Sequence, residues 1–425
     1  MKRKKNDLSN SVTASVAVIL LAVVIGIVYF FPDQIRFTLS TIRDASTQFA
    51  SLTLSHNFRT VAQIKKNYEL ASLDPATKKV RILVVPGHDP NSGGAEFKGV
   101  KERDLAVEVG QNLKQFFQND TRYEVMVARD TSAWSPVFAT YFKNNWEEIK
   151  EWRKTSRDEF SYLVDIGSIT RTISKVYHDD VPSDIAVQLY GITKWSNEND
   201  VDIVIHIHFN DNPRPKASLP GTHSGFTIYV PAEQYGNSTT TKVIANNIFK
   251  RLEKYNPVSS LPGESTGVVD EPELIAIGAN NTSDAASMLI EYSYIYEPQL
   301  QDPQIRSLIT KDFAYETFLG LHDFFDPTVA NNLARPYDTL VLPYSWKKVL
   351  TQTNASPQDI FALQTALMVD GVYPPDGKNN NDCPRTGIFG PCTRSALKTF
   401  QTKRGISDEK GIVGDKTLIE LKKLY

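Results

Sequence analysis

Residues Ile82–Leu113 read ILVVPGHDPNSGGAEFKGVKERDLAVEVGQNL. The stretch begins as an apolar β-rich run, passes through a glycine-containing loop, and continues with Leu105, Val109 and Leu113 at the spacing of one helix face. A second β-rich run, Tyr123–Ala128, follows it. Strands that alternate with helical segments predict an α/β fold, in which a mostly parallel twisted sheet is flanked by helices.

Acidic or imidazole side chains lie near the ends of three such runs. They are His88 after Arg81–Pro86, Glu102 at the start of the helix that follows, His208 after Val201–Ile207, and Glu291 after Ser287–Ile290. In an open α/β sheet, ligands and catalytic groups gather outside the carboxyl ends of the strands. Two histidines and a carboxylate brought together there would hold zinc with an open position for water, and a second carboxylate could act as base. The pattern predicts a metallohydrolase.

The same segments carry a family resemblance. Residues Ile82–Leu113 resemble the opening motif of zinc-dependent N-acetylmuramoyl-L-alanine amidases, in which a glycine-histidine loop and a downstream glutamate bind the metal. Val201–Asn212, VDIVIHIHFNDN, looks like the strand that carries the family's second histidine, and the Gly-aromatic strand Gly225–Val230 follows it. Ser287–Ile295, SMLIEYSYI, is similar to the late strand that ends in the catalytic glutamate. The segments occur in the family's order.

The resemblance implies a role for each reactive side chain. His88, Glu102 and His208 would bind Zn²⁺, and Glu291 would act as the catalytic base. His206 and His208 face the same side of a strand, so either could bind metal. The family pattern places the ligand directly before Phe209-Asn210, which selects His208. His206 and Asn210 are then candidates for contacts that support the metal ligands.

Composition sets further bounds. Of 425 residues, 47 are basic and 49 acidic, so the totals carry no nucleic-acid signature. The chain begins MKRKKN, followed by the uncharged run Ser11–Phe31, which is long enough to span a hydrocarbon core of ~30 Å as a helix. The positive-inside rule keeps the basic tail in the cytoplasm and sends everything after Pro32 outward. A cleaved signal peptide is the alternative, but the apolar run is longer than the usual ~7–15 residues.

The end of the chain has a different pattern. Residues from Ser356 onward resemble the small helical peptidoglycan-binding domain. The chain's two cysteines, Cys383 and Cys392, lie there; they could form a disulfide in an oxidising compartment or remain unpaired. The expected segments are a cytoplasmic tail at 1–10, a transmembrane anchor at 11–31, a stalk at 32–79, a zinc amidase domain at 80–326, a linker at 327–355 and a peptidoglycan-binding-like domain at 356–425.

The stretch at about 134–190 is longer than the core of the family requires, so it is an expected insertion. Pro136–Phe160 has charged and aromatic residues at helical spacing, so we expect it to be structured. It would be a surface decoration, a lid, or a binding surface for a regulatory protein.

Together these features predict a single-pass membrane protein whose extracytoplasmic domain cleaves the amide bond between N-acetylmuramic acid and L-alanine of peptidoglycan. A zinc peptidase or carboxypeptidase acting on cell-wall peptides is one alternative. A catalytically inactive wall-binding scaffold is another, although all four reactive side chains are present.

Overall fold

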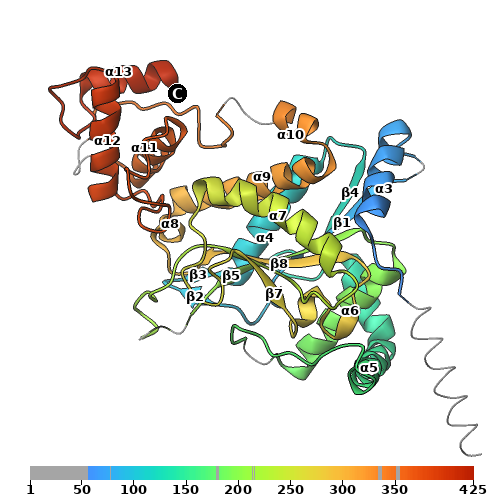
Figure 1. Ribbon diagram of the computed structural model, residues 1–425. Coiled ribbons are helices and arrows are strands. Elements are labelled where there is room, and N and C mark those ends of the chain that lie inside the picture. Colours follow the sequence, from blue (N-terminus) through green and yellow to red (C-terminus); the bar gives the residue numbers. More distant parts are fainter. Residues whose placement is uncertain are drawn as a thin grey trace, which may run out of the picture. The chain divides into compact units, whose positions relative to one another are not determined.

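A six-stranded sheet organises the computed structural model, which describes residues 56–76, 78–178, 181–212, 214, 216–333, 337–350 and 355–425 (Figure 1). The strand order is β4-β1-β5-β8-β6-β7. The strands are β1 (Val80–Pro86), β4 (Tyr123–Val127), β5 (Ile203–Asn210), β6 (Thr227–Pro231), β7 (Val268–Glu271) and β8 (Ala286–Tyr294). A separate pair, β2 (Glu96–Phe97) and β3 (Val100–Lys101), forms a short antiparallel ribbon.

The sheet is mostly parallel, which confirms the predicted fold class. β1 pairs in parallel with β4 and β5, β5 with β8, and β6 with β7. β6 runs antiparallel to β8, a reversal that the sequence pattern does not predict. The predicted runs also end too early, because β5 continues through His208 and β8 continues through Glu291.

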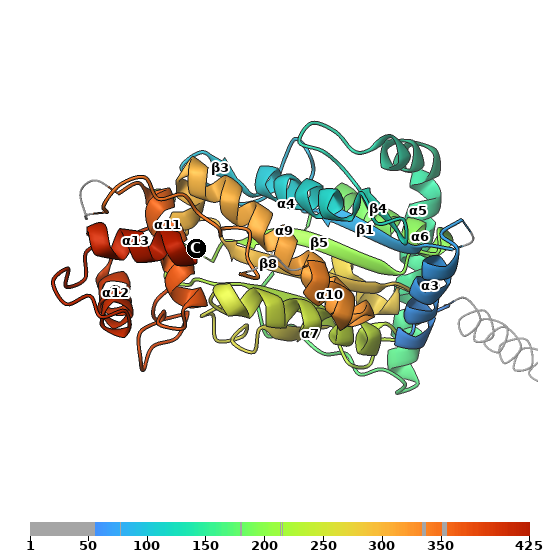
Figure 2. The same cartoon turned by 90° about the horizontal axis from the view of Figure 1, so that it is seen from above.

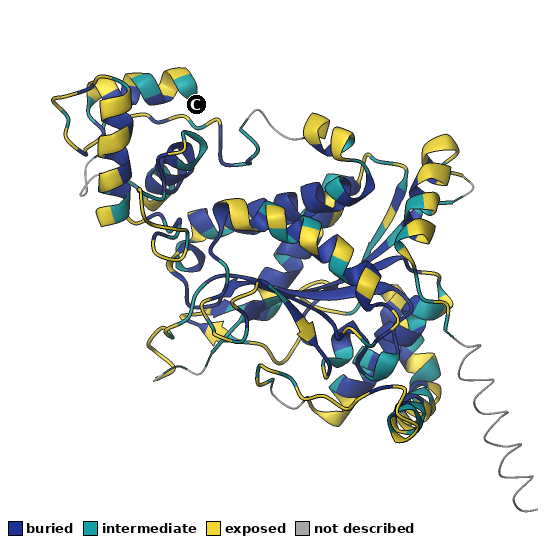
Figure 3. Ribbon diagram, viewed as in Figure 1, coloured by how far each residue is buried: buried dark blue, intermediate teal, exposed yellow. Residues whose placement is uncertain are grey.

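Helices cover both faces of the sheet (Figures 1 and 2). One layer contains α4 (Glu102–Phe117), α7 (Ser238–Tyr255) and α9 (Pro303–Phe325); the other contains α5 (Pro136–Asp165) and α6 (Ser183–Glu198). Alternate residues of β1 enter different cores, since Ile82 and Val84 pack with the first layer and Leu83 and Val85 with the second. Figure 3 accordingly shows the central strands buried along most of their length, as expected for a sheet covered on both faces.

The region predicted as a stalk is partly packed on this sheet. Helix α3 (Val61–Leu73) buries Ile64 and Tyr68 in the core, and the Nδ2 atom of Asn67 donates to Asp202 at 2.8 Å. The compact unit therefore begins at Phe58, well before residue 80. The predicted basic tail, the anchor at 11–31 and the stalk up to residue 55 lie outside the described residues. Within the described residues, no helix is long and apolar enough to cross a membrane.

The insertion is structured, as its helical spacing predicts. It contains α5 and the first half of α6, and α5 extends five residues beyond the expected Phe160 to Asp165. Between these helices runs an extended segment, residues 169–178, that we call the strap. The short 3-10 helices η1 (Ile275–Ile277) and η2 (Ala279–Asn281) follow β7, and the one-turn helix α8 (Pro298–Gln301) follows β8.

The segment predicted as a linker is also packed. After α10 (Pro327–Leu333), the side chains of Leu342, Trp346 and Leu350 are buried in the main core. The C-terminal region contains α11 (Pro357–Val369), α12 (Pro391–Lys403) and α13 (Asp415–Leu424), and Cys383 and Cys392 form a disulfide.

Candidate metal centre

His88 lies on the loop that leaves β1, at the carboxyl end of the parallel strands. Its backbone has a φ of 68°, a left-handed conformation that is uncommon for a residue with a side chain. Neighbouring glycines make room for the ring. A Cβ atom on Gly87 would lie 2.5 Å from the His208 ring, and one on Gly94 would lie 2.8 Å from the His88 ring. The glycine-histidine loop therefore allows the two imidazoles to approach each other.

Glu102 is the first residue of α4, where the helix dipole favours a negative charge. The backbone amide of Ala95 donates to its Oε2 atom at 2.8 Å, and the amide of Phe209 donates to its Oε1 atom at 3.1 Å. The side chain is almost fully buried, and these two bonds stabilise and orient its carboxylate. The backbone of β5 therefore holds a carboxylate that comes from a different element.

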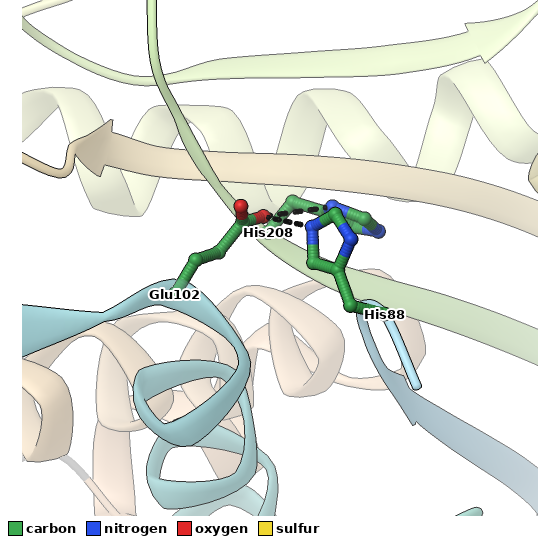
Figure 4. A group of neighbouring side chains, drawn as sticks. All are labelled: His88, Glu102 and His208. Atoms are coloured by element: carbon green, nitrogen blue, oxygen red, sulfur yellow. Dashed lines mark hydrogen bonds and ion pairs between the residues drawn. The ribbon is translucent and has the colours of Figure 1, made fainter. Parts of the chain in front are cut away.

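Figure 4 shows how the three predicted ligands converge. Glu102 Oε1 lies 2.8 Å from Nε2 of His88 and 3.0 Å from Nδ1 of His208. One ligand atom from each residue lies within 4.8 Å of the others. His208 is inside β5 and not beyond it, so the chain supplies this ligand from a rigid strand.

The residues fit a zinc ion. Nε2 of His88 is buried and makes no hydrogen bond to any described residue, although it lies 2.8 Å from a carboxylate oxygen. A ring nitrogen and a carboxylate oxygen that lie this close together suit a shared cation. Two imidazoles and one carboxylate form a donor set that catalytic zinc sites use, with the fourth position open.

The electrostatics of these groups agree with that assignment. Burial opposes ionisation of Glu102, but His88 and His208 hold the pKa of its carboxyl below its ordinary value. Burial lowers the pKa of His208, which favours the neutral ring, although Glu102 opposes the shift. A carboxylate and neutral imidazoles are the protonation states that bind metal.

A buried arginine supports the loop that carries His88. The guanidinium of Arg129, which follows β4, donates to the carbonyl oxygens of Pro86 at 3.1 Å and Arg103 at 3.0 Å, and also to that of Gly87. Burial lowers the pKa of Arg129 to about 10. The side chain links β4, the metal-binding loop and α4. Its sequence signal is an arginine directly after an apolar strand, which is too common to be specific.

His206 and Asn210 make contacts other than the predicted ones. Burial and the neighbouring His208 lower the pKa of His206 to about 3, and its ring interacts with the backbone of Ala276. Its Nε2 atom is buried and has no hydrogen-bond partner among the described residues. Asn210 donates through Nδ2 to Glu264 at 2.9 Å. Within the described part of the chain, neither side chain bonds to His88, Glu102 or His208.

Glu291 lies next to the three ligands. It is paired in register with His208 on the neighbouring strand, so both side chains point to the same face of the sheet. Its Oε2 atom is buried without a hydrogen-bond partner among the described residues. Burial raises the pKa of this carboxyl well above its ordinary value, and the nearby carboxylates of Glu102 and Glu264 add to the shift.

Glu264 is the main residue that sequence reasoning missed. It precedes β7 and is fully buried. Its donors, which come from three strands and its own loop, are Asn210 at 2.9 Å, Tyr229 at 2.5 Å, Tyr294 at 3.1 Å and the hydroxyl of Ser259. The residue stands in an irregular loop, LPGEST, where no periodic pattern marks it.

A cavity of about 700 Å³ opens beside the ligands. His88 and His208 line it, and so does His206. The strap and the first half of α6, which belong to the insertion, line it as well. The predicted insertion is thus part of the site and more than a surface decoration.

Comparison with known families agrees with this geometry. Residues 165–314 match the family model described as N-acetylmuramoyl-L-alanine amidase, and residues 356–421 match the one described as a putative peptidoglycan binding domain. The protein carries an amidase domain of this family. The amidase match includes His208 and Glu291, whereas His88 and Glu102 precede it. The predicted recognition, enzyme class and cleavage of a peptidoglycan amide bond are confirmed.

Solved structures of amidases are also similar to this chain. N-acetylmuramyl-L-alanine amidase from Mycobacterium smegmatis is 12% identical, with 59% of this chain and 100% of that chain covered and a TM-score of 0.38. An amidase from Clostridium difficile 630 is 14% identical, with 58% and 97% covered and a TM-score of 0.36. AmiC2 of Nostoc punctiforme is 13% identical, with 58% and 96% covered and a TM-score of 0.33. No curated protein sequence matches at a significant level.

Proposed function

We propose that the protein is a zinc-dependent amidase that hydrolyses the bond between N-acetylmuramic acid and L-alanine in peptidoglycan. The observation that carries this proposal is the convergence of His88, Glu102 and His208 within 4.8 Å, beside the buried carboxyl of Glu291. The family match supports the substrate class, and the set of ligand atoms supports zinc as the metal.

His88, Glu102 and His208 would hold the metal. A zinc ion bound there would polarise the scissile carbonyl and lower the pKa of a bound water. The chain itself contributes rigidity, because Glu102 is fixed by the amides of Ala95 and Phe209. Pre-organised ligands keep the reacting atoms in position.

Glu291 would move the proton. Its carboxylate accepts a proton from the attacking water and then returns that proton to the leaving nitrogen of L-alanine. Burial raises the pKa of this carboxyl, which favours the second step, the return of the proton to the leaving nitrogen. Its partnerless Oε2 atom leaves an acceptor open for this purpose.

The C-terminal domain would hold the enzyme on its polymeric substrate. The match over residues 356–421 supports peptidoglycan as its ligand. Its Arg385 forms a fully buried ion pair with Asp312 of α9 at 2.7 Å, so the wall-binding domain is packed on the amidase domain. Anchoring through residues 11–31, with the enzyme outside the cell membrane, remains a prediction.

The decisive experiment is product analysis. Purified peptidoglycan is incubated with residues 56–425, zinc-loaded or stripped by a chelator, and the new ends are identified by mass spectrometry. We expect free lactyl groups on muramic acid with the zinc-loaded protein alone. Shortened stems on intact muramic acid would identify a peptidase instead. Unchanged peptidoglycan together with retained wall binding would identify an inactive scaffold.

A further inference from the structure

A loop of the C-terminal domain is stapled into a fixed shape. Residues 374–384, which we call the docking loop, lie between α11 and α12, and the disulfide between Cys383 and Cys392 ties the end of this loop to the first turn of α12. Inside the loop, the Oδ1 atom of Asn379 accepts from the amide of Asn381 at 2.9 Å, and the amide of Cys383 donates to the carbonyl oxygen of Asn379 at 3.0 Å. The side chains that follow Asn379 therefore have a defined direction.

Two asparagines of the docking loop bond to the amidase domain. Nδ2 of Asn380 donates to the carbonyl oxygen of Glu253 at 2.9 Å, and Nδ2 of Asn381 donates to the carbonyl oxygen of Val258 at 2.6 Å. Helix α7 ends between these two acceptors, at Tyr255. The docking loop thus holds the backbone on both sides of the point where the chain leaves the helix.

A buried ion pair keeps the two asparagines close to their acceptors. Arg385, the residue directly after the docking loop, donates to Asp312 of α9 at 2.7 Å, and its guanidinium lies 5.2 Å from the ring centre of Tyr255. Both charged side chains are almost completely buried. Because separation of the pair would leave an uncompensated buried charge, the docked arrangement is the stable one.

The segment that follows α7, residues 257–264, leads from these bonds toward the active site. The amide of Ser259 donates to the carbonyl oxygen of Phe226 at 2.8 Å, and Val258 forms a parallel bridge with Phe226. The approach is close, since a Cβ atom on Gly225 would lie 2.5 Å from the carbonyl oxygen of Val258. The oxygen that accepts from the docking loop is therefore packed tightly against the chain that enters β6.

The same segment bonds to the ends of two strands of the site. The hydroxyl of Ser259 donates to the buried carboxylate of Glu264 and lies 3.1 Å from the hydroxyl of Tyr294. Glu264 in turn accepts from Asn210 at 2.9 Å and from Tyr294 at 3.1 Å. Asn210 ends β5, and Tyr294 ends β8. Buried hydrogen bonds thus connect residues 257–264 to both strands.

We infer that the docking loop positions the catalytic site through residues 257–264, with Asn380 and Asn381 as the positioning residues. The inference rests on the proposed function, since β5 and β8 carry His208 and Glu291, two and three residues before their ends. A shift of about 1 Å in a catalytic group can cost about 10²-fold in rate, even when its cause lies far from the reacting atoms. The C-terminal domain thus contributes to the rate of hydrolysis as well as to wall binding.

A small soluble substrate separates positioning from adhesion, because a muramoyl dipeptide does not need the wall-binding domain to reach the metal. With this substrate we expect Asn380→Ala/Asn381→Ala to lower kcat about fivefold, which corresponds to the loss of about one net hydrogen bond, while KM and zinc content match the wild type. Neither side chain is buried, so the variant should fold.

Two further variants make this comparison sharper. Asn381→Asp keeps the shape of the side chain but cannot donate, so its kcat should also fall. Lys378→Ala is the matched control, since it removes an exposed side chain from the same loop and should leave kcat unchanged. If the double asparagine variant kept the kcat of the wild type on the soluble substrate, the inference would be wrong.

A double-mutant cycle tests the route. Ser259→Ala removes the hydroxyl that links the segment to Glu264. If the docking loop acts through this network, adding Asn381→Ala to Ser259→Ala should lower kcat by less than about twofold, because the two residues share one pathway. Fully additive losses would show that the loop does not act through residues 257–264, and would overturn the inference.

Hydrogen exchange provides a measurement without turnover. The amide of Ser259 should exchange about fivefold faster in Asn380→Ala/Asn381→Ala, because the segment opens more often when its outer bonds are lost. The amide of Ala128, which bonds to Val84 at 2.9 Å in a distant part of the sheet, is the control and should not change. Unchanged exchange at Ser259 would contradict the inference.

The outcome for the wild type separates the two proposals. Wild-type protein that releases no lactyl ends would refute the proposed function. Wild-type protein that releases them, together with an asparagine variant that releases them equally fast, would refute the positioning role alone.

Discussion

Two parts of the sheet contribute to the site by different means. One is the set of mutually parallel strands β4, β1, β5 and β8, which we call the parallel half, and the other is the pair β6 and β7, which runs antiparallel to β8 and which we call the β6–β7 half. In the parallel half, β1, β5 and the start of α4 bring His88, His208 and Glu102 together at one edge. In the other half, loops around β7 supply Glu264 and the contacts that hold the strap. Strand order places the first set, and irregular backbone places the second. The comparison suggests that the parallel half performs the chemistry and the β6–β7 half shapes and supports it.

Removal of a metal ligand is the strongest test of that division. His88→Ala, Glu102→Ala and His208→Ala should each lose zinc and nearly all activity, because each removes one of three protein ligands. His206→Ala, on the same strand face as His208, is the matched control and should retain most of its metal. Elemental analysis of the purified variants measures this. A metal-free His206→Ala beside a loaded His208→Ala would reverse the assignment.

Glu291→Gln tests the proton transfer separately from metal binding. The variant keeps the size of the side chain but cannot accept the proton, so we expect turnover to fall about 10²–10⁴-fold. Zinc content should match the wild type. The rate of lactyl-end release is the measurement, and a rate near that of the wild type would exclude Glu291 as the base.

Glu264→Ala tests the supporting half. The change leaves buried donors on Asn210, Tyr229 and Tyr294 without their acceptor, and each orphaned donor costs about 1–3 kcal/mol. We expect the free energy of unfolding to fall by about 4 kcal/mol, measured by denaturant titration, with the zinc content retained. Glu233→Ala, an exposed position after β6, is the control and should cost less than about 0.5 kcal/mol. Loss of zinc from folded Glu264→Ala would show that the two halves are not separable.

The smallest expected effect is a pH dependence of the free energy of unfolding, caused by His322, which packs against Tyr123 of β4. Burial among aromatic rings lowers the pKa of His322 to about 4, against about 6.5 in an unfolded chain. The unfolded state therefore binds the proton first as pH falls. Stability from this group is complete above pH 6.5 and is lost between pH 6.5 and 4, by about 3 kcal/mol.

His322→Phe should flatten that slope, because phenylalanine cannot titrate. Its ring would replace an imidazole whose Nε2 atom has no partner among the described residues. Denaturant unfolding of both proteins between pH 4 and 7 measures the difference. Parallel slopes for the two proteins would place the titrating group elsewhere.

The sequence predicts the parallel half well and the other half poorly. His88 follows an element with strong periodicity, Glu102 opens one and His208 lies within one, and motif order then selects the two histidines from the others. The antiparallel direction of β6 leaves no mark in its apolar run, since both faces of the strand are buried either way. Glu264 stands in an irregular loop, and its role exists only because three strands deliver donors to it.

Boundaries fail for a related reason. The predicted stalk contains an amphipathic helix, α3, whose partners on β1 are visible only in three dimensions. The predicted linker is packed for the same reason, because Trp346 and Leu350 are buried in a core that other segments form. The sequence does not decide whether Cys383 and Cys392 form a disulfide. The fold decides it, because it brings their Cα atoms to 5.8 Å.

The arginine that follows β4 has a consequence for how the metal is gained and lost. Because Arg129 binds the carbonyl oxygens of Pro86 and Gly87, the two residues before His88, we expect the loop to keep its shape when the ion leaves. Little conformational entropy is then lost when zinc enters, and the intrinsic affinity of the ligands is expressed almost fully. We therefore expect a chelator to remove the metal and the activity, and to leave a folded domain that can be loaded again.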